Sequence, residues 1–472
     1  MNEPIPALQR ASMWRAASVF VKARLGLFGT AGWVTVAFML QQVVRLGSSI
    51  ILAWLLAPAL LGTMLLINTL RTGVELLTDV GVGQSIVNNP RGNDPSFYNT
   101  AWTIQIIRGV ILTIVALALS VPVAKMYDNT ALIYLLPFVA PIFIIAGFMS
   151  PSRFLLQKRM EVGKVATFDL VLGVVAAVVQ IALAAYSPTI WALIWGLLIT
   201  TAIWSAASFY IIDWRDHRLH WDMDAAKSIL HFGKWIFLST LIYFLAMNFD
   251  RLYFADAIPI ALLGVYGIAR TFSETVMQLF QRISNLLIFP KISASLLRGA
   301  DLRRSMGPMR MVMLLGIAAG LAVGISFADE FIFLVYDDRY RAAGFFLTVL
   351  LFGTWFAILA AISDAMMMGV GKPSGVAISN GAKLAVIVAL LPFLLATFGI
   401  NAALAVFVFA EMVRYAALMW LKRKQGIGFA RQDVIATVVF IILAFAFREL
   451  TMLVGLTGGV SEWITQASMP HV

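Results

Sequence analysis

The sequence contains no cysteine among its 472 residues. This absence excludes disulfide bonds, thiolate chemistry and metal sites with cysteine ligands. Charged residues are also scarce: they make up 12% of the chain, whereas soluble domains carry about 25%. Hydrophobic residues account for 61%, and the mean hydropathy is +0.89. The composition therefore excludes an ordinary soluble protein and indicates a chain that lies largely within a membrane.

Several apolar stretches are long enough to cross a hydrocarbon layer of about 30 Å as helices. A transmembrane barrel would instead show alternating segments of about ten residues. We therefore predict an all-α integral membrane protein. The pattern predicts thirteen helices, over about 31–56, 59–86, 100–124, 131–150, 166–186, 189–212, 235–257, 261–290, 311–335, 344–369, 375–398, 401–421 and 433–456. We expect Arg448 and Glu449 to interrupt the last of these, which would then be either a full span or a broken pair.

The net charge of +11 is distributed unevenly along the chain. Most Lys and Arg residues fall in the N-terminal segment and in alternate loops, and the intervening loops hold few. That pattern places the N-terminus in the cytoplasm, and basic loops beside anionic lipid require no nucleic acid. The apolar run that follows the basic N-terminus is too long for a signal-peptide core, so we expect an uncleaved first helix.

One pattern occurs twice, about 200 residues apart, which indicates an internal duplication. Each copy opens with Gly and Trp, turns at a proline, restarts with Ala-Leu-Leu-Gly and then carries Arg-Thr-x-x-Glu in an apolar helix. The copies run over 32–75 and 233–274. Six helices per copy is an even number, so both copies enter the membrane from the same side and the repeat is parallel.

The repeat predicts two six-helix lobes around a central cavity, with one or two further helices at the C-terminus. The expected domains are a cytoplasmic segment (1–27), an N-lobe (28–212), a cytoplasmic inter-lobe loop (213–234), a C-lobe (235–422), and a C-terminal helix with its tail (423–472).

Charged residues inside these helices require an explanation, because each costs about 2.5–3.5 kcal/mol at the centre of a membrane. Arg71, Glu75 and Asp79 recur every fourth residue and form one polar stripe on their helix. Such a stripe faces a partner helix or a wet cavity and not lipid. Asp250 and Arg251 lie near the outer end of the helix predicted over 235–257.

Two interpretations of these charges remain open. In the first, neighbours on one helix neutralise each other, as spacing allows for Arg71 with Glu75, Arg270 with Glu274, and Arg414 with Glu411. That interpretation leaves four basic residues without a carboxylate one turn away: Arg45, Arg108, Arg282 and Lys383.

In the second interpretation, basic side chains line a cationic cavity. Arg108 and Arg282 lie where they could instead extend to the cytoplasmic interface. Arg45 and Lys383 lie deeper, so a cationic cavity explains them better. Guanidinium groups hold phosphate through paired hydrogen bonds, so such a cavity would suit a phosphorylated substrate.

Several other motifs do not support a function. The stretch 369–374 resembles the end of a phosphate-binding loop, but Met366 replaces the required first glycine. His217 and His220 are better explained as residues of a solvated loop than as metal ligands. No catalytic residues and no metal site are predicted.

With the repeat established, the chain resembles bacterial oligosaccharide flippases of the polysaccharide transporter family. These belong to the multidrug/oligosaccharidyl-lipid/polysaccharide exporter superfamily. The resemblance covers about 28–425. It rests on Ile51–Gly62 with Asp79–Gly83, on Asn248–Arg251 leading to Leu263–Ala269, on Phe289-Pro290 and on Gly369–Pro373.

The resemblance implies two lobes that open alternately to each side of the bacterial inner membrane. It also implies a substrate of undecaprenyl-pyrophosphate carrying an oligosaccharide, destined for exopolysaccharide or O-antigen assembly, with a polymerase and export machinery as further partners. No cofactor is expected besides H⁺ or Na⁺ as coupling ion.

On this basis we predict two sets of functional residues. The expected substrate-binding residues are Arg45, Arg71, Arg270, Lys383, Arg108 and Arg282. The expected ion-coupling residues are Glu75, Asp79, Glu274, Asp364, Glu411 and Asp250.

Three alternative functions are considered. A multidrug/cation antiporter of the same superfamily would require a more acidic cavity. A lipid II flippase would also have a cationic cavity, so it stays open. An integral-membrane polymerase or glycosyltransferase would need a larger loop for catalysis than any in this chain.

Overall fold

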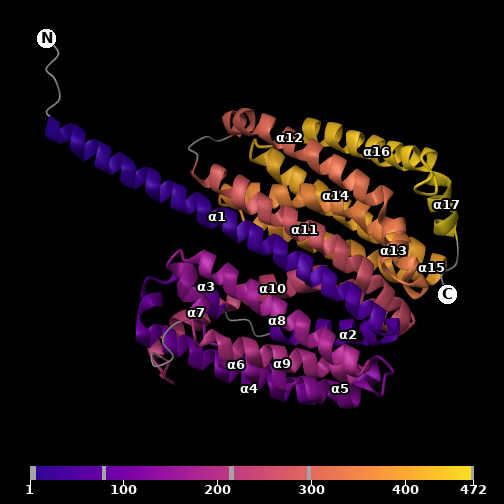
Figure 1. Cartoon of the computed structure of the whole chain (residues 1–472), viewed down its shortest axis with the longest axis horizontal. Helices are drawn as coiled ribbons and strands as arrows, with labels where there is room; N and C mark the ends of the chain where they lie inside the picture. The colour runs from indigo at the N-terminus through magenta and orange to yellow at the C-terminus, as the bar shows by residue number, and fades with distance from the viewer. Residues whose placement is uncertain (1–6, 77–80, 212–216, 295–298, 469–472) are drawn as a thin grey trace, which may run out of the picture.

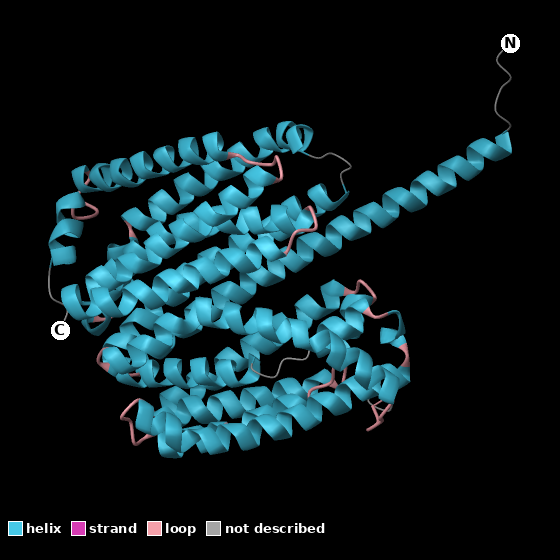
Figure 2. Cartoon of the chain, turned by 180° about the vertical axis from the view of Figure 1, so that it is seen from behind, coloured by secondary structure: helices cyan, strands magenta, loops and turns pink. Residues whose placement is uncertain are grey.

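The computed structural model of the chain describes residues 7–76, 81–211, 217–294 and 299–468, and every regular element within them is helical (Figure 2). Asp79 lies outside the described residues. The first half contains α1 (Ala7–Leu55), α2 (Pro58–Leu76), α3 (Val82–Asn88), α4 (Pro95–Met126), α5 (Leu132–Val139), α6 (Pro141–Phe148), α7 (Ser152–Lys158), α8 (Val162–Tyr186) and α9 (Ile190–Ser208). The second half contains α10 (Met223–Ala257), α11 (Ile260–Ala294), α12 (Gly299–Ser326), α13 (Ala328–Val335), α14 (Ala342–Gly369), α15 (Ser374–Lys424), α16 (Ala430–Leu453) and α17 (Val460–Ser468).

Within the part of the chain that the structure describes, each of the thirteen predicted ranges contains helix, although α2 and α3 share the range 59–86 and α5 and α6 share the range 131–150. Among the described residues, eight helices are long and apolar enough to cross a membrane, and a bent pair ending in α7 would make a ninth. The charged helices α2, α10 and α11 are not among these eight. The chain is therefore an all-helical, multi-pass membrane protein, as predicted.

Several predicted helix boundaries differ from the structure. Of the two alternatives for the last helix, a full span or a broken pair, the structure has the first: α16 is continuous through Arg448 and Glu449, and Arg448 forms ion pairs with Asp329 and Glu462. The helix predicted over 311–335 is broken at Phe327 into α12 and α13. The two helices predicted over 375–421 form α15, which breaks at Gly399 with φ 78°.

The two halves of the chain form two groups of helices that lie side by side (Figure 1). Helices α2–α9 lie in one group and α11–α17 in the other, while α10 lies between them and packs against both α2 and α15. Helix α1 packs along α8, and its N-terminal part extends away from the rest of the molecule. The predicted segment 1–27 is therefore largely helical from Ala7 onward.

The two copies of the repeated pattern meet where α2 packs against α11. A Cβ on Gly62 would lie 2.0 Å from the carbonyl oxygen of Ile260, and a Cβ on Gly264 would lie 2.0 Å from that of Pro58. The contact is reciprocal, as a two-fold relation between the copies requires. Only glycine allows this approach, which explains why both copies carry it at the same place. The relation between whole lobes stays a prediction.

We call the end of the molecule at this contact the outer end, following the predicted orientation. Side chains at this end bridge the two halves. Trp54 donates through Nε1 to the carbonyl oxygen of Val335 (2.7 Å), and the Tyr340 hydroxyl donates to that of Leu56 (3.0 Å). Tyr127 likewise donates to the carbonyl oxygen of Leu252 (3.2 Å). The halves are thus joined at the outer end by hydrogen bonds as well as by the glycine contact.

The predicted inter-lobe loop 213–234 is shorter than expected, because α10 begins at Met223. Asp222 caps this helix by accepting hydrogen bonds from the backbone N–H groups of Asp224 and Ala225. It also forms an ion pair with Arg91 (2.7 Å). The Arg91 guanidinium lowers the pKa of the Asp222 carboxyl to about 2.

His217, expected in a solvated loop, contacts Tyr98 and Ser150 instead.

Replacing Asp222 with alanine is expected to lower the melting temperature of the purified protein, because α10 loses its cap and Arg91 its partner. The folded state favours ionised Asp222, so this stabilisation is present above the carboxyl's ordinary pKa of 3.8 and is lost as pH falls through about 2. The difference from wild type should be equal at pH 7 and pH 5 and should shrink at lower pH. Asp224→Ala, two residues further along the chain, is the control. A difference that grew on acidification would contradict the assignment.

Candidate functional site

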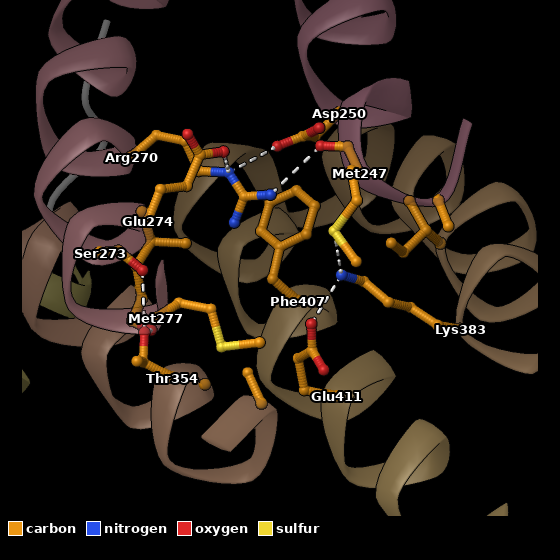
Figure 3. Close-up of a pocket in the computed structure, with 15 residues that line it drawn as sticks. Met247, Asp250, Arg270, Ser273, Glu274, Met277, Thr354, Lys383, Phe407 and Glu411 are labelled. Atoms are coloured by element: carbon orange, nitrogen blue, oxygen red, sulfur yellow. Dashed lines mark hydrogen bonds and ion pairs between the residues drawn. The ribbon is translucent and has the colours of Figure 1, made fainter. Parts of the chain in front are cut away.

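Four helices, α10, α11, α14 and α15, surround a small charged cavity in the second half of the chain (Figure 3). Its volume is about 70 Å³. On α11 the residues Arg270, Ser273, Glu274 and Met277 share one helical face and point into it. The remaining charged lining residues are Asp250 from α10, and Lys383 and Glu411 from α15. The cavity thus gathers residues that are far apart in the sequence.

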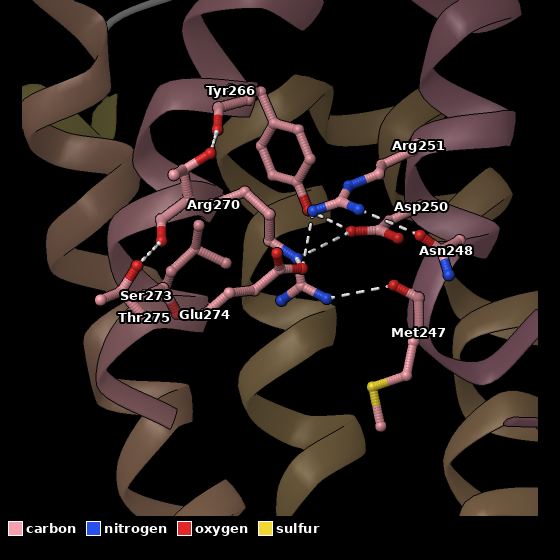
Figure 4. A network of polar contacts seen from close by, with 12 residues as sticks. Met247, Asn248, Asp250, Arg251, Tyr266, Arg270, Ser273, Glu274 and Thr275 are labelled. Carbon is pink, nitrogen blue, oxygen red and sulfur yellow. Dashed lines mark hydrogen bonds and ion pairs between the residues drawn. The ribbon is translucent and has the colours of Figure 1, made fainter. Parts of the chain in front are cut away.

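Arg270 is the centre of one polar network at this cavity (Figure 4). Its Nε lies 3.4 Å from a carboxylate oxygen of Asp250 and 3.2 Å from one of Glu274. A terminal nitrogen donates to the carbonyl oxygen of Met247 (3.3 Å). Tyr266 donates its hydroxyl to Asp250, and Arg251 pairs with Glu274 at 2.6 Å. Two arginines and two carboxylates therefore neutralise one another in this network.

Lys383 is the centre of a second network on the other side of Met247 (Figure 3). Its Nζ lies 2.6 Å from a carboxylate oxygen of Glu411 and 3.6 Å from the sulfur of Met247. Glu411 also pairs with Arg414 (3.3 Å), which in turn holds Asp364 at 2.7 Å. Met247 contacts both networks, through its carbonyl oxygen and through its sulfur.

These ion pairs correct the expectation that Arg270 and Lys383 line a cavity without compensating carboxylates. Arg270 and Lys383 do not face an uncompensated cationic cavity, because three carboxylates line the same space. The physical reason is the cost of an unpaired ion in a medium of low dielectric constant, which amounts to several kcal/mol. The ion pairs predicted from helical spacing are all present: Arg71 with Glu75, Arg270 with Glu274, and Arg414 with Glu411.

In the first half, Arg71 and Glu75 line a separate polar cavity of about 270 Å³ between α2, α6 and α9. Their side chains are 3.1 Å apart and are 26% and 42% exposed. Thr200, Thr201 and Trp204 complete the polar side of this cavity. Arg108 on α4 donates to the backbone carbonyl oxygen of Glu75. The first half therefore holds its own arginine–glutamate pair, and this pair is more accessible than those of the second half.

Two further predicted residues lie along the seam between the halves, where α1 meets α11. Arg45 donates to the hydroxyl of Thr275, and Arg282 lies over the ring of Phe38, 4.5 Å from its centroid. The structure thus brings Asp250, Arg270 and Glu274 together, and separately Asp364, Lys383 and Glu411. It places Arg71, Glu75 and Arg108 in the first half, and Arg45 and Arg282 on the seam.

Sequence reasoning missed another buried pair at the predicted cytoplasmic end. Arg310 of α12 pairs with Asp433 of α16, and both side chains are almost fully buried. Tyr415 donates its hydroxyl to the same carboxylate. The sequence shows only an isolated arginine and an isolated aspartate, each at the end of an apolar helix. Because they are far apart in the sequence, their spacing could not predict that they pair.

Comparison with known proteins identifies a family and two relatives with similar sequences. A family model described as "Polysaccharide biosynthesis protein" matches residues 51–344. The chain is 22% identical over 63% of its length to the teichuronic acid biosynthesis protein TuaB of Bacillus subtilis (strain 168). It is 23% identical over 50% of its length to a Shigella flexneri protein that is named as an O-antigen transporter. The alignments span 62% and 57% of those two proteins.

Solved structures share the fold. The lipid II flippase MurJ in an inward closed conformation superposes with a TM-score of 0.72 at 11% sequence identity, covering 92% of this chain and 95% of the flippase. An inward-facing multidrug resistance MATE transporter of the MOP superfamily superposes with a TM-score of 0.60 at 14% identity, covering 84% and 95%. At these identities the likeness establishes the fold and not the substrate.

Proposed function

Since the chain belongs to the polysaccharide biosynthesis protein family, we propose that it is a flippase for undecaprenyl-pyrophosphate-linked oligosaccharide. It moves this lipid from the cytoplasmic to the outer face of the bacterial inner membrane, for exopolysaccharide or O-antigen assembly. The family match, which covers residues 51–344, is the observation that carries this proposal. The names of the two relatives, which refer to teichuronic acid biosynthesis and O-antigen transport, support a substrate of this class.

The ion pairs suggest how a pyrophosphate could be held and released. A pyrophosphate can replace a carboxylate as the partner of a guanidinium, because both accept paired hydrogen bonds from it. In this proposal Arg71 and Arg270 exchange their carboxylate partners for substrate, assisted by Arg45, Arg108, Arg282 and Lys383.

A carboxylate that loses its basic partner in a low-dielectric site then favours a proton or Na⁺. We propose that Glu75, Asp79, Glu274, Asp364, Glu411 and Asp250 couple transport to such an ion. Substrate binding and ion binding are thereby linked through the same arginines.

The membrane potential favours this direction of transport. With the interior negative, each elementary charge that crosses is worth about 2.3 kcal/mol per 100 mV, so outward movement of an anionic pyrophosphate is favourable. The hydrogen bonds between the halves at the outer end suit a state that receives substrate from the cytoplasmic side, given a cytoplasmic N-terminus. The polymerase and the export machinery that receive the product are the partners of this function.

A deletion strain provides the test, with lipid-linked oligosaccharide measured on the cytoplasmic face of the membrane. We expect the intermediate to accumulate and the wild-type protein to reverse the accumulation. No accumulation together with altered drug sensitivity would reject the flippase in favour of a multidrug antiporter. Accumulation of lipid II in place of the oligosaccharide lipid would favour a peptidoglycan flippase.

A further inference from the structure

Arg71 lies between two cavities of opposite character. On one side is the polar cavity of about 270 Å³ that it shares with Glu75. On the other is a cavity of about 210 Å³ enclosed by α2, α4, α5, α6 and α10. Arg71 is the single charged residue among those that line this second cavity, and the others include Leu70, Ala116, Ala140 and Phe244. Arg71 and Phe143 line both spaces, so the two cavities adjoin at these residues.

The packing of α4 against α6 explains where the apolar cavity forms. At Gly109 the two helices nearly touch, since a Cβ there would lie 2.4 Å from the carbonyl oxygen of Phe143. Further toward the outer end, the small side chains of Ala116 and Ala140 leave space between α4 and the α5–α6 segment. Pro141 begins α6 and lacks the N–H that would continue the hydrogen bonding of α5. The cavity reaches the surface of α4 at Leu119, which is 38% exposed.

The two cavities have a defined order across the membrane. Helix α2 begins at the outer end with Pro58, and Arg71 is followed one turn later by Glu75. The polar cavity therefore lies on the predicted cytoplasmic side of Arg71. The apolar cavity extends toward the outer end, where Val123 of α4 and Leu252 of α10 line it. A lipid in the cytoplasmic leaflet has the same order, with its headgroup facing the cytoplasm and its chain directed toward the bilayer centre.

We infer that the first half of the chain contains a bipartite site for a polyprenyl phosphate. The phosphate is held by the Arg71 guanidinium at the polar cavity, and the first isoprene units of the chain lie in the apolar cavity. Hydroxyl groups of Thr200 and Thr201 and the ring of Trp204 then face the first sugar. This inference rests on the proposed function and adds to it the location of the lipid chain.

The position of Arg71 favours a polyprenyl phosphate as the ligand of the apolar cavity. An apolar cavity alone would accept any hydrocarbon, but this one begins at a guanidinium whose aliphatic stem lines it. A chain attached directly to a phosphate fills both spaces without a gap. A phospholipid acyl chain is separated from its phosphate by a glycerol backbone and an ester, whose polar atoms would have to enter the apolar cavity at a cost.

Filling the apolar cavity provides the test. Ala116→Phe places a ring inside it from α4, and Ala118→Phe adds the same ring on the exposed face of the same helix as the matched control. The probe is undecaprenyl monophosphate, with binding to the purified full-length protein measured by native mass spectrometry. Ala116→Phe should weaken binding by about tenfold or more, since tenfold corresponds to the loss of about two buried methylene groups. Ala118→Phe should bind as wild type does.

Two further probes separate the parts of the site. Inorganic pyrophosphate should lose affinity in Arg71→Ala but not in Ala116→Phe, whereas undecaprenyl monophosphate should lose affinity in both. Phosphatidylglycerol should bind more weakly than the polyprenyl phosphate and should be unaffected by Ala116→Phe. If phosphatidylglycerol competed equally and lost affinity in Ala116→Phe, the cavity would be a phospholipid site and the inference would be overturned.

Transport separates failure of this inference from failure of the proposed function. If wild-type protein reversed the accumulation of lipid-linked oligosaccharide and Ala116→Phe did so equally well at equal membrane abundance, the flippase would stand and the lipid-chain site would be rejected. Equal binding of undecaprenyl monophosphate by Ala116→Phe and Ala118→Phe would reject it as well. Melting temperatures of both variants show whether a loss reflects misfolding, and a misfolded Ala116→Phe is replaced by Ala140→Leu, which fills the same cavity from the opposite wall.

Discussion

Replacing Arg270 with alanine is expected to abolish export of the lipid-linked oligosaccharide. Arg270 holds Asp250 and Glu274 at once, and its side chain is only 13% exposed. Asp250 is 3% exposed and would be left as a buried carboxylate without this cation. Removing one partner of a buried ion pair costs about 3–5 kcal/mol. We therefore expect a lower melting temperature in addition to the loss of transport.

A double variant separates the structural role of Arg270 from its functional one. Asp250→Asn combined with Arg270→Gln removes both charges and keeps similar volumes, so most of the lost stability should return. Transport should stay lost, because a glutamine cannot hold a pyrophosphate as a guanidinium does and an amide at position 250 cannot take up a coupling ion. Arg341→Ala, an exposed arginine of the outer loop, is the control and should behave as wild type. Full transport by the double variant would remove Arg270 from the substrate site and Asp250 from ion coupling, and would leave the pair a structural one.

Replacing Gly62 with valine is expected to prevent the outer end from closing. A Cβ at this position would lie 2.0 Å from a carbonyl oxygen of α11, a backbone atom that cannot rotate away. Overpacking of this kind costs about 1–3 kcal/mol. Because the contact joins the two halves, this cost falls on the closed outer end and favours a state in which α2 and α11 separate. Transport should fall strongly, since alternating access requires the outer end to close in each cycle.

The natural absence of cysteine makes this opening directly measurable. Ser49 lines a cavity of about 220 Å³ between the halves near the outer end, and Ser49→Cys introduces a single reactive thiol there. Labelling by a membrane-impermeant maleimide added from outside should be about tenfold faster in Gly62→Val, since tenfold corresponds to about 1.4 kcal/mol of the expected cost. Gly47→Val is the matched control, because a Cβ at Gly47 meets no atom within 4 Å. Unchanged labelling in Gly62→Val would show that the glycine contact does not control access.

Local patterns along the chain predicted one part of the charge network. Arg71 with Glu75 and Arg270 with Glu274 are four residues apart on one helix, so helical geometry alone brings them together. The partners of Lys383 and Asp250 could not be predicted in this way. Lys383 meets Glu411 across the break in α15, and Asp250 meets Arg270 across the turn between α10 and α11.

The expectation that Lys383 lacks a carboxylate partner was wrong for the same reason. Arg45 and Lys383 have no carboxylate one turn away, so the sequence alone predicts that their charges are uncompensated. In the folded chain Lys383 has a carboxylate from a distant part of its own helix, and Arg45 has a hydroxyl from α11. Neutralisation inside a membrane can use any neighbouring helix, so counting charges on one helix overestimates those that are unpaired.

The sequence by itself determined that this chain is a helical membrane protein, that its two halves share a pattern, and that its charges lie within apolar helices. These properties depend on hydropathy and on spacing along one helix, which are local. Only the tertiary structure decided which charges pair between helices, that Gly62 and Gly264 meet, and that Arg71 separates a polar from an apolar cavity. The physical reason is that the angles and contacts between helices arise from side chains far apart in the sequence, and no local period records them.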